Sequence, residues 1–241
     1  MTITGSDRTD GEADPGNGTD READPSLTPL YGHRSLDALT ERCLHLTRAG
    51  RALLGIVGEP GAGKSTFAEQ LLARLEKEQP GLAVAVSMDG FHLAQKVIEA
   101  RGQAAGKGTI DTFDADGFLA LLRRTRDETG NTVWWPEFDR DLEDPVAGAI
   151  DVAPHHRLVI VDGNFLLAAE DPWRQVKNVL DESWFLDALP EPRRERLIRR
   201  YITYGFTPQA ARAKTLGVDE DTSALIRSTV SRADLVLSEL G

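Results

Sequence analysis

The chain has 241 residues, of which 40% are hydrophobic and 28% charged, a composition that suits one α/β domain with a sizeable core. Its formal net charge of −11 argues against nucleic acid as the main partner, because phosphate backbones bind basic surfaces. The single cysteine, Cys43, allows no internal disulfide, and its helical context places it in the core. No apolar run approaches the roughly 20 residues that span a bilayer, and the acidic N-terminus is unlike a signal peptide. We therefore expect a cytoplasmic protein that binds neither nucleic acid nor a membrane.

Residues 1–30 are rich in Gly, Asp, Thr and Pro, and their seven acidic residues and two arginines contribute −5 of the net charge, leaving −6 for the rest of the chain. An imperfect repeat, Thr-Asp-Gly-Glu-Ala-Asp-Pro and Thr-Asp-Arg-Glu-Ala-Asp-Pro, occupies 9–15 and 19–25. Large apolar side chains that would offset the entropy of ordering are scarce here. We expect a disordered acidic tail, either solubilising or functional, followed by one domain over 31–241.

A helix is predicted to begin after Ser35, a suitable N-cap, and to end at Gly50. The residues predicted to face inward at helical spacing are Leu36, Leu39, Cys43 and Leu46. Further helical patterns at 115–126 and 190–202 alternate with strands predicted at 53–57, 82–88, 132–135, 158–161, 184–186 and 235–237. This alternation predicts a three-layer α/β/α fold with a mainly parallel sheet, in which ligands bind beyond the carboxyl ends of the strands.

The segment after the first apolar run has the spacing G-x-x-x-x-G-K-S, and a helical pattern from 66 to 75 follows it. A buried strand, a glycine turn and a helix N-terminus together form a phosphate-binding site. Lys64 is expected to reach the β- and γ-phosphates of ATP, and Ser65 to ligate Mg²⁺. The residues predicted to bind the nucleotide are Gly58, Glu59, Pro60, Gly61, Ala62, Gly63, Lys64, Ser65 and Thr66.

Asp89 follows the apolar run at 82–88, within the stretch Ser-Met-Asp-Gly-Phe-His at 87–92. A carboxylate at this position is predicted to accept the proton of an attacking hydroxyl, or to ligate Mg²⁺ beside Ser65. The alternative is a turn former, because Asp-Gly is a common turn pair. His92 is predicted to contact the substrate, although a surface or core position would explain it equally well.

A charged cluster, Glu-Phe-Asp-Arg at 137–140, follows the apolar Val-Trp-Trp at 133–135. Asp139 and Arg140 are predicted to contact a polar substrate, and a solvated loop is an equally good alternative. Adjacent tryptophans at a strand end are more often core, but with Phe138 they could stack on a base.

Asp162 ends the apolar run at 158–161 and therefore has the form of a Walker B acid. An aspartate there holds Mg²⁺ directly or through water, and an ordinary polar strand end is the alternative.

Residues 190–214 hold six arginines and one lysine against two glutamates. Arg193, Arg196 and Arg200 lie three and four residues apart, so one helical face can present three guanidinium groups, with Arg199 near its edge. Phosphoryl transfer gains from positive charge around the migrating group. We predict an arginine-rich helical lid over about 190–216, with Arg196 and Arg200 as its catalytic residues; a solvated helix is the alternative.

Together these residues resemble the phosphoribulokinase/uridine kinase family of P-loop kinases over about residues 35–240. The matching motifs are the phosphate loop, 89–92, Lys-Gly-Thr at 107–109 with Thr-Phe-Asp at 112–114, 136–140, 161–167 and Ala-Asp-Leu-Val at 233–236. The resemblance is greatest to a nucleoside/nucleotide kinase-like branch related to uridine and pantothenate kinases. It implies a P-loop NTPase fold, Asp89 as the catalytic base, a homodimer, and transfer of the ATP γ-phosphate to a hydroxyl of a nucleoside, pantothenate, a sugar or a sugar phosphate.

Two features depart from that pattern. Asp162 stands where related kinases commonly have Glu, which implies a water-mediated contact to Mg²⁺, and residues 218–223 lack an expected Asn. The sequence therefore predicts an ATP- and Mg²⁺-dependent small-molecule kinase with a nucleoside-like acceptor, and pantothenate or a sugar as alternatives. A GTPase switch is disfavoured because no Asn-Lys-x-Asp stretch occurs; a catalytically idle ATP-binding module is the remaining alternative.

Overall fold

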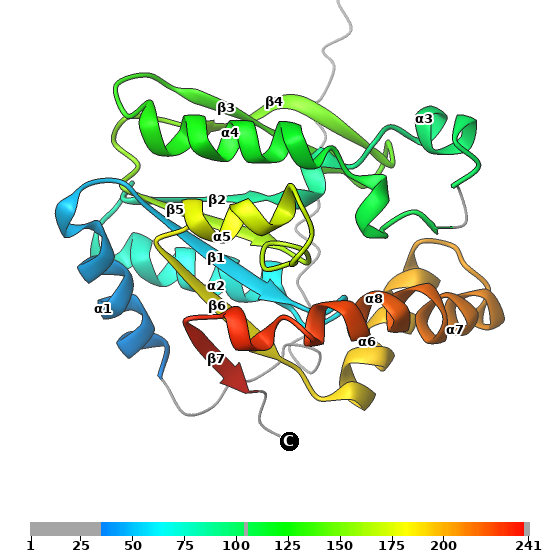
Figure 1. The fold of residues 1–241 in the computed structure, drawn as a ribbon. Helices are drawn as coiled ribbons and strands as arrows, with labels where there is room; N and C mark the ends of the chain where they lie inside the picture. The colour runs from blue at the N-terminus through cyan, green and yellow to red at the C-terminus, as the bar shows by residue number, and fades with distance from the viewer. Residues whose placement is uncertain (1–34, 104–105, 239–241) are drawn as a thin grey trace, which may run out of the picture.

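The computed structural model describes residues 35–103 and 106–238 (Figure 1), so the acidic tail predicted at 1–30 lies outside the described residues. Within the described residues, a sheet of five parallel strands has the order β2-β5-β1-β6-β7. These strands are β1 (Ala52–Gly58), β2 (Ala83–Ser87), β5 (Leu158–Gly163), β6 (Glu182–Asp187) and β7 (Leu235–Ser238). The prediction of a mainly parallel sheet with covering helices is confirmed.

The register of the central strands brings their carboxyl ends together. In β1, Ile56 lies beside Asp162 of β5, and Asp162 in turn lies beside Ser87 of β2. Every residue of β1 is buried, as expected for a central strand with helices on both faces. The phosphate loop after β1, Asp89 after β2 and Asp162 at the end of β5 therefore lie at one edge of the sheet.

Two apolar cores cover the two faces of the sheet. One contains Leu54 and Ile56 of β1 with residues of α1 (Leu36–Leu46) and α2 (Lys64–Glu78). The other contains Leu53 and Val57 with residues of α4 (Ala115–Asp127) and α5 (Val176–Val179). Figure 1 shows these helix pairs on opposite sides of the strands, which gives the three predicted layers.

The predicted N-cap and core positions of the first helix are confirmed. The Ser35 hydroxyl accepts a hydrogen bond from the Ala38 amide at 3.2 Å, and Leu39 and Cys43 are buried. The α-helix ends at Leu46, and a 3₁₀ turn continues the chain to Gly50.

The strand predicted at 132–135 was wrongly placed in the parallel sheet. Instead, β3 (Val133–Asp139) pairs antiparallel with β4 (Asp144–Val152) in a separate hairpin that the sequence analysis did not predict. Val133 and Trp135 are fully buried whereas Trp134 is 57% exposed. This alternation is typical of a strand that covers the core with one face only. The charged cluster at 137–140 consequently lies at a hairpin tip, and not beyond the end of a parallel strand.

The helices after β6 pack beside the phosphate loop. They are α6 (Pro190–Thr203), α7 (Pro208–Leu216) and α8 (Val218–Arg227), and Leu197, Tyr201 and Ala211 form a small apolar cluster between α6 and α7. The helix predicted at 190–202 is thus confirmed. A short helix, α3 (Gln95–Ala100), lies at the same end of the molecule as α7 (Figure 1). None of the described helices combines the length and hydrophobicity needed to cross a bilayer.

Candidate active site

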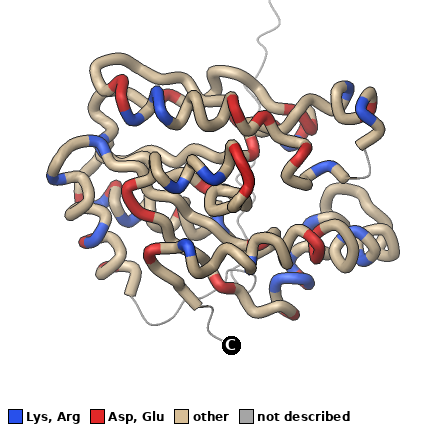
Figure 2. The backbone as a smooth tube through the Cα atoms, viewed as in Figure 1, with Lys and Arg blue, Asp and Glu red and all other residues tan. Residues whose placement is uncertain are grey.

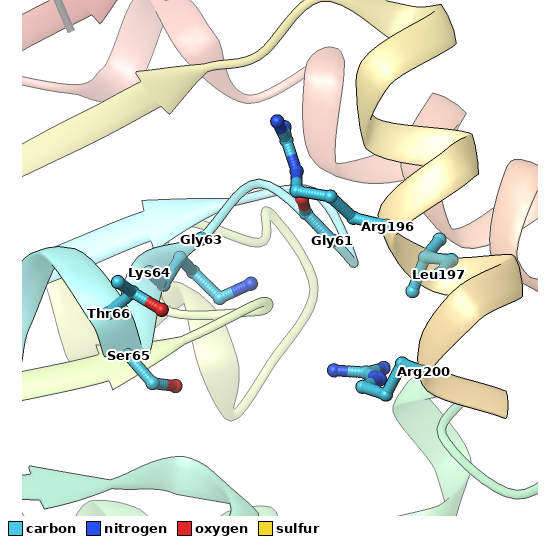
Figure 3. A pocket seen from close by; sticks show the side chains of 8 residues that line it. All are labelled: Gly61, Gly63, Lys64, Ser65, Thr66, Arg196, Leu197 and Arg200. Carbon is cyan, nitrogen blue, oxygen red and sulfur yellow. The ribbon is translucent and has the colours of Figure 1, made fainter. Parts of the chain in front are cut away.

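The phosphate loop has the backbone geometry that its glycines predict. Gly61 and Gly63 adopt positive φ angles of 77° and 85°, and Gly63 is the N-cap of α2. A Cβ atom on Gly61 would lie 2.8 Å from both the Arg193 carbonyl oxygen and the Leu197 Cγ atom, so α6 packs directly against the loop. A pocket of about 210 Å³ opens between them (Figure 3), and its lining residues are Gly61, Gly63, Lys64, Ser65, Thr66, Arg196, Leu197 and Arg200.

The side chains at the start of α2 and the end of β5 lie within hydrogen-bonding distance of each other. The Ser65 hydroxyl donates a hydrogen bond to Asp162 Oδ2 at 2.8 Å, and Asp162 is only 7% exposed. Burial and the charge of Asp89 raise the pKa of Asp162, although the Ser87 and Ser65 hydroxyls oppose that rise. A buried carboxylate whose charge is destabilised by burial and by a second carboxylate, and which lies beside a hydroxyl, suits a divalent cation. Ser65 and Asp162, with Asp89 nearby, would therefore hold Mg²⁺.

The Lys64 ammonium donates a hydrogen bond to the Glu59 carbonyl oxygen at 3.1 Å. Burial lowers the pKa of Lys64 to about 8, against the opposing effect of Asp162 and Asp89. The sequence predicts that ATP contacts the charged form of the ammonium, so above pH 8 this binding would require proton uptake. We expect the affinity for ATP to fall by up to about tenfold per pH unit between pH 8 and 10.

Calorimetric titration of ATP at pH 7, 8 and 9 measures this effect. The exposed-lysine variant Lys77→Met is the control and should show the same pH profile as the wild type. An affinity that does not change between pH 7 and pH 9 would contradict the assignment of the titrating group.

Asp89 lies in a 3₁₀ turn, Met88–Phe91, directly after β2. The turn packs closely under the hairpin, because a Cβ on Gly90 would lie 2.4 Å from the Pro136 carbonyl oxygen. Arg140, at the hairpin tip, donates a hydrogen bond to Asp89 Oδ2 at 2.9 Å, and His92 Nδ1 lies 2.9 Å from the Asp89 carbonyl oxygen. The hairpin thus brings Arg140 to the turn that carries Asp89. No local sequence pattern specifies this contact.

Electrostatics keep the Asp89 carboxyl group ionised. Burial tends to raise its pKa, but His92, Arg140, Lys64 and Arg200 together lower the pKa below its ordinary value. The His92 imidazole has a lowered pKa, chiefly because it is buried, and its neutral form is therefore favoured at neutral pH. An ionised carboxylate at the mouth of a phosphate-binding loop can orient a hydroxyl and accept its proton.

These groups share a cavity of about 680 Å³, a volume typical of small-molecule sites. Its lining includes most of the predicted site residues, namely Pro60, Gly61, Lys64, Ser65, Asp89, His92, Arg140, Asp162 and Arg200. The structure does not bring Asp139 to the cavity: its carboxylate accepts the amide hydrogens of Asp141 and Leu142 and so closes the hairpin turn. Neither Trp134 nor Trp135 lines the cavity, whereas Phe138 does.

The arginines of α6 have different surroundings. Arg193 is fully buried and donates to the Pro60 carbonyl oxygen at 3.1 Å, so it packs behind the loop. Arg196 Nε donates to the Gly61 carbonyl oxygen at 2.9 Å. Figure 3 shows the Arg200 guanidinium directed toward Lys64 and Ser65, and that of Arg196 directed away from them. Of the two predicted catalytic arginines, Arg200 is therefore the better placed for a transferred phosphate.

Sequence reasoning missed a group of ion pairs, which we call the Glu59 network: Glu59, Arg193, Arg194, Glu220 and Arg227. Glu59 is 3% exposed and pairs with Arg193 at 2.8 Å and Arg227 at 2.6 Å; Glu220 pairs with Arg193 at 2.8 Å and Arg194 at 3.0 Å. Glu59 and Ala62 are buried, and a Cβ on Gly58 would meet the Leu186 carbonyl oxygen at 2.9 Å. The predicted role of Glu59 was to contact the nucleotide. Its side chain instead pairs with Arg193 and Arg227 and so joins the phosphate loop to α6 and α8.

Comparisons with known proteins agree with this geometry. The family model described as Phosphoribulokinase / Uridine kinase family matches residues 53–241. A putative uridine kinase of Schizosaccharomyces pombe is 31% identical over 215 residues, which cover 86% of this chain and 91% of that protein. The protein YggC of Escherichia coli K12 is 31% identical over 217 residues, 86% of this chain and 89% of its own length. Among solved structures, a putative fructose transport system kinase from Silicibacter sp. TM1040 has 35% identity and a TM-score of 0.77, covering 84% of this chain and 98% of that one.

Proposed function

The chain belongs to the phosphoribulokinase/uridine kinase family of ATP-dependent kinases, and from this premise we propose that it transfers the γ-phosphate of ATP to an alcohol hydroxyl of a small molecule, with Mg²⁺ as the cation. One observation carries the proposal. An ionised carboxylate, Asp89, lines the same cavity as Lys64 and Ser65 of the phosphate loop. A phosphate donor and a hydroxyl acceptor can therefore meet there.

In the proposed reaction, Lys64 and the amides at the start of α2 hold the β- and γ-phosphates. Mg²⁺, held by Ser65 and Asp162, would neutralise charge on the phosphate oxygens. The acceptor oxygen bonds to the γ-phosphorus as the bond to the bridging oxygen of ADP breaks, and the hydroxyl proton passes to Asp89. Because the transition state is loose, the alignment that Arg140 gives to Asp89 matters more than the basicity of the carboxylate.

Arg200 is assigned the contact to the transferred phosphate, because it lines both the cavity and the smaller pocket beside the loop. Arg196 is assigned to the loop itself, where it holds the Gly61 carbonyl oxygen. The α6 helix would then act as a wall that positions the loop, with Arg200 as its catalytic group.

Three acceptor classes are compatible with this reaction: a nucleoside, pantothenate and a sugar. A nucleoside is favoured if aromatic side chains can stack on its base. Neither tryptophan lines the cavity, since Trp135 is buried in the core and Trp134 is exposed on the opposite face of its strand, but Phe138 does line it. The relative of known structure at 35% identity is described as a putative fructose transport system kinase, which favours a sugar or another polyol. We give the polyol class precedence for this reason.

The test is acceptor-dependent release of ADP from ATP by the purified protein, across nucleosides, pantothenate and sugars. We expect one acceptor to raise turnover at least about a hundredfold over ATP alone, and chelation of Mg²⁺ to abolish it. Tight ATP binding without turnover on any acceptor would instead favour the idle ATP-binding module.

A further inference from the structure

Basic side chains gather around one aromatic ring beside Asp89. The Arg140 guanidinium carbon lies 4.9 Å and the Lys107 Nζ atom 5.2 Å from the centre of the Phe138 ring. The His92 ring lies 5.0 Å from the same centre. All of these residues line the 680 Å³ cavity. Cation–π contacts with the Phe138 ring therefore hold positively charged groups in the space that an acceptor would occupy.

A further lysine reaches this place from the opposite wall of the cavity. Lys214, on α7, donates a hydrogen bond to the Lys107 carbonyl oxygen at 3.4 Å, and its Nζ atom lies 5.4 Å from the centre of the Tyr201 ring. Figure 2 shows basic positions both on the C-terminal helices and on the segment before α4, at the same end of the molecule. Two segments more than a hundred residues apart in sequence thus each bring an ammonium group to one cavity.

Neither lysine is neutralised by a hydrogen-bonded carboxylate within the described part of the chain. Lys107 donates to the Glu143 carbonyl oxygen at 2.8 Å, while the Glu143 carboxylate, 56% exposed, lies 3.7 Å away. Asp219 also lines the cavity, but its carboxylate oxygens accept the Tyr201 hydroxyl at 3.1 and 2.9 Å. An ammonium has three N–H donors, so both lysines keep donor capacity for a ligand.

We propose that the phosphate acceptor carries an anionic group, a phosphate monoester or a carboxylate, which Lys107 and Lys214 bind while the acceptor hydroxyl lies at Asp89. This inference rests on the proposed kinase function and names the substrate class for the same site. A neutral acceptor would leave the remaining N–H donors of both ammonium groups without an anionic partner in a partly enclosed cavity, and it would therefore bind less well. Arg140 contributes to the positive field but stays paired with Asp89.

Matched acceptors test the proposal in the ADP-release assay: glycerol, glycerol 3-phosphate and glycerate; glucose, glucose 6-phosphate and gluconate; ribose, ribose 5-phosphate and ribonate. We expect kcat/KM for one anionic member to exceed that of its neutral parent at least about tenfold, and the phosphate and carboxylate arms distinguish the two anions. The Lys107→Met and Lys214→Met variants should raise the KM for that acceptor by about tenfold to a hundredfold, the effect of losing a charged hydrogen bond. Their KM for ATP should stay within about twofold of the wild type.

Control variants separate charge from folding. Lys96→Met changes an exposed lysine on α3 and should leave the KM for every acceptor unchanged. Lys107→Arg keeps the positive charge and should restore most of the affinity that Lys107→Met loses. A loss equal in Lys107→Arg and Lys107→Met would show that packing, not charge, is responsible, and would overturn the proposal.

Binding provides a readout that needs no turnover. With Mg²⁺ and a non-hydrolysable ATP analogue filling the phosphate loop, inorganic phosphate should bind a second site calorimetrically, and the Lys107→Met/Lys214→Met double variant should lose this binding. Absence of second-site binding in the wild type, or faster phosphorylation of the neutral parents, would overturn the anionic acceptor while leaving the kinase function intact. Lysine-dependent phosphate binding without turnover on any acceptor would contradict the kinase function and support the anion site alone.

Discussion

Replacing Asp89 with Asn is expected to lower kcat by about 10²- to 10⁴-fold while the KM for ATP changes by no more than about twofold. The amide has nearly the same shape as the carboxylate, but it cannot accept the hydroxyl proton, and it loses the ion pair with Arg140 at 2.9 Å. The ATP contacts should remain, because they are assigned to the phosphate loop and not to the 3₁₀ turn that carries Asp89. Steady-state kinetics with the best acceptor of the matched panel measure both constants.

The matched control for this substitution is Asp116→Asn, because Asp116 is an exposed aspartate in the first turn of α4. Its kcat should equal that of the wild type. Near-normal turnover by Asp89→Asn would remove the catalytic base from the mechanism and leave Asp89 as a turn former.

Removal of Glu59 is expected to destabilise the protein and to weaken ATP binding together. In Glu59→Ala, the fully buried Arg193 and its neighbour Arg227 lose their shared carboxylate, and only Glu220 still faces Arg193. Breaking a buried ion pair by removing one partner costs about 3–5 kcal/mol, and the remaining Glu220 contact places this variant near the lower end, about 3 kcal/mol. For a chain of this size the midpoint of thermal unfolding should then fall by roughly 6–12 °C.

The KM for ATP should rise in the same variant, because Arg193 also holds the Pro60 carbonyl oxygen and α6 packs on Gly61. Urea unfolding gives the free energy, with Glu69→Ala as the control, since Glu69 is exposed on α2. A double variant, Glu59→Ala/Arg193→Met, should lose less stability than the sum of the single variants, because the two side chains interact directly. Additive losses, or a Glu59→Ala variant as stable as Glu69→Ala, would contradict the coupling.

The local parts of the active site follow from the sequence because their geometry is contained in short segments. The spacing from Gly58 to Ser65 fixes a strand, a glycine turn and a helix N-terminus. Likewise, the uninterrupted apolar run before Asp162 is typical of a strand buried on both faces, so its polar end had to lie at the edge of a parallel sheet. Asp89 also follows a predicted strand. The phosphate loop, Asp89 and Asp162 could therefore be assigned to one edge of the sheet without knowledge of any contact between them.

What the sequence could not provide were the contacts between segments distant in the chain. A short strand pattern at 132–135 does not specify which strand it pairs with, and the structure pairs it with β4 and not with the central sheet. Helical spacing places Arg193, Arg196 and Arg200 on one face, but packing against the loop decides that Arg193 is buried with Glu59 while Arg200 lines the cavity.

The proximity of Lys107, Phe138 and Lys214 also results from contacts between segments that are distant in the chain. These residues come from a loop, a hairpin and a C-terminal helix, and no periodicity in the sequence relates them. Local patterns are set by the backbone's own steric and hydrogen-bonding preferences, which act over a few residues. Which charged side chains share a cavity is set instead by the burial of apolar surface across the whole fold, and only the tertiary structure reveals it.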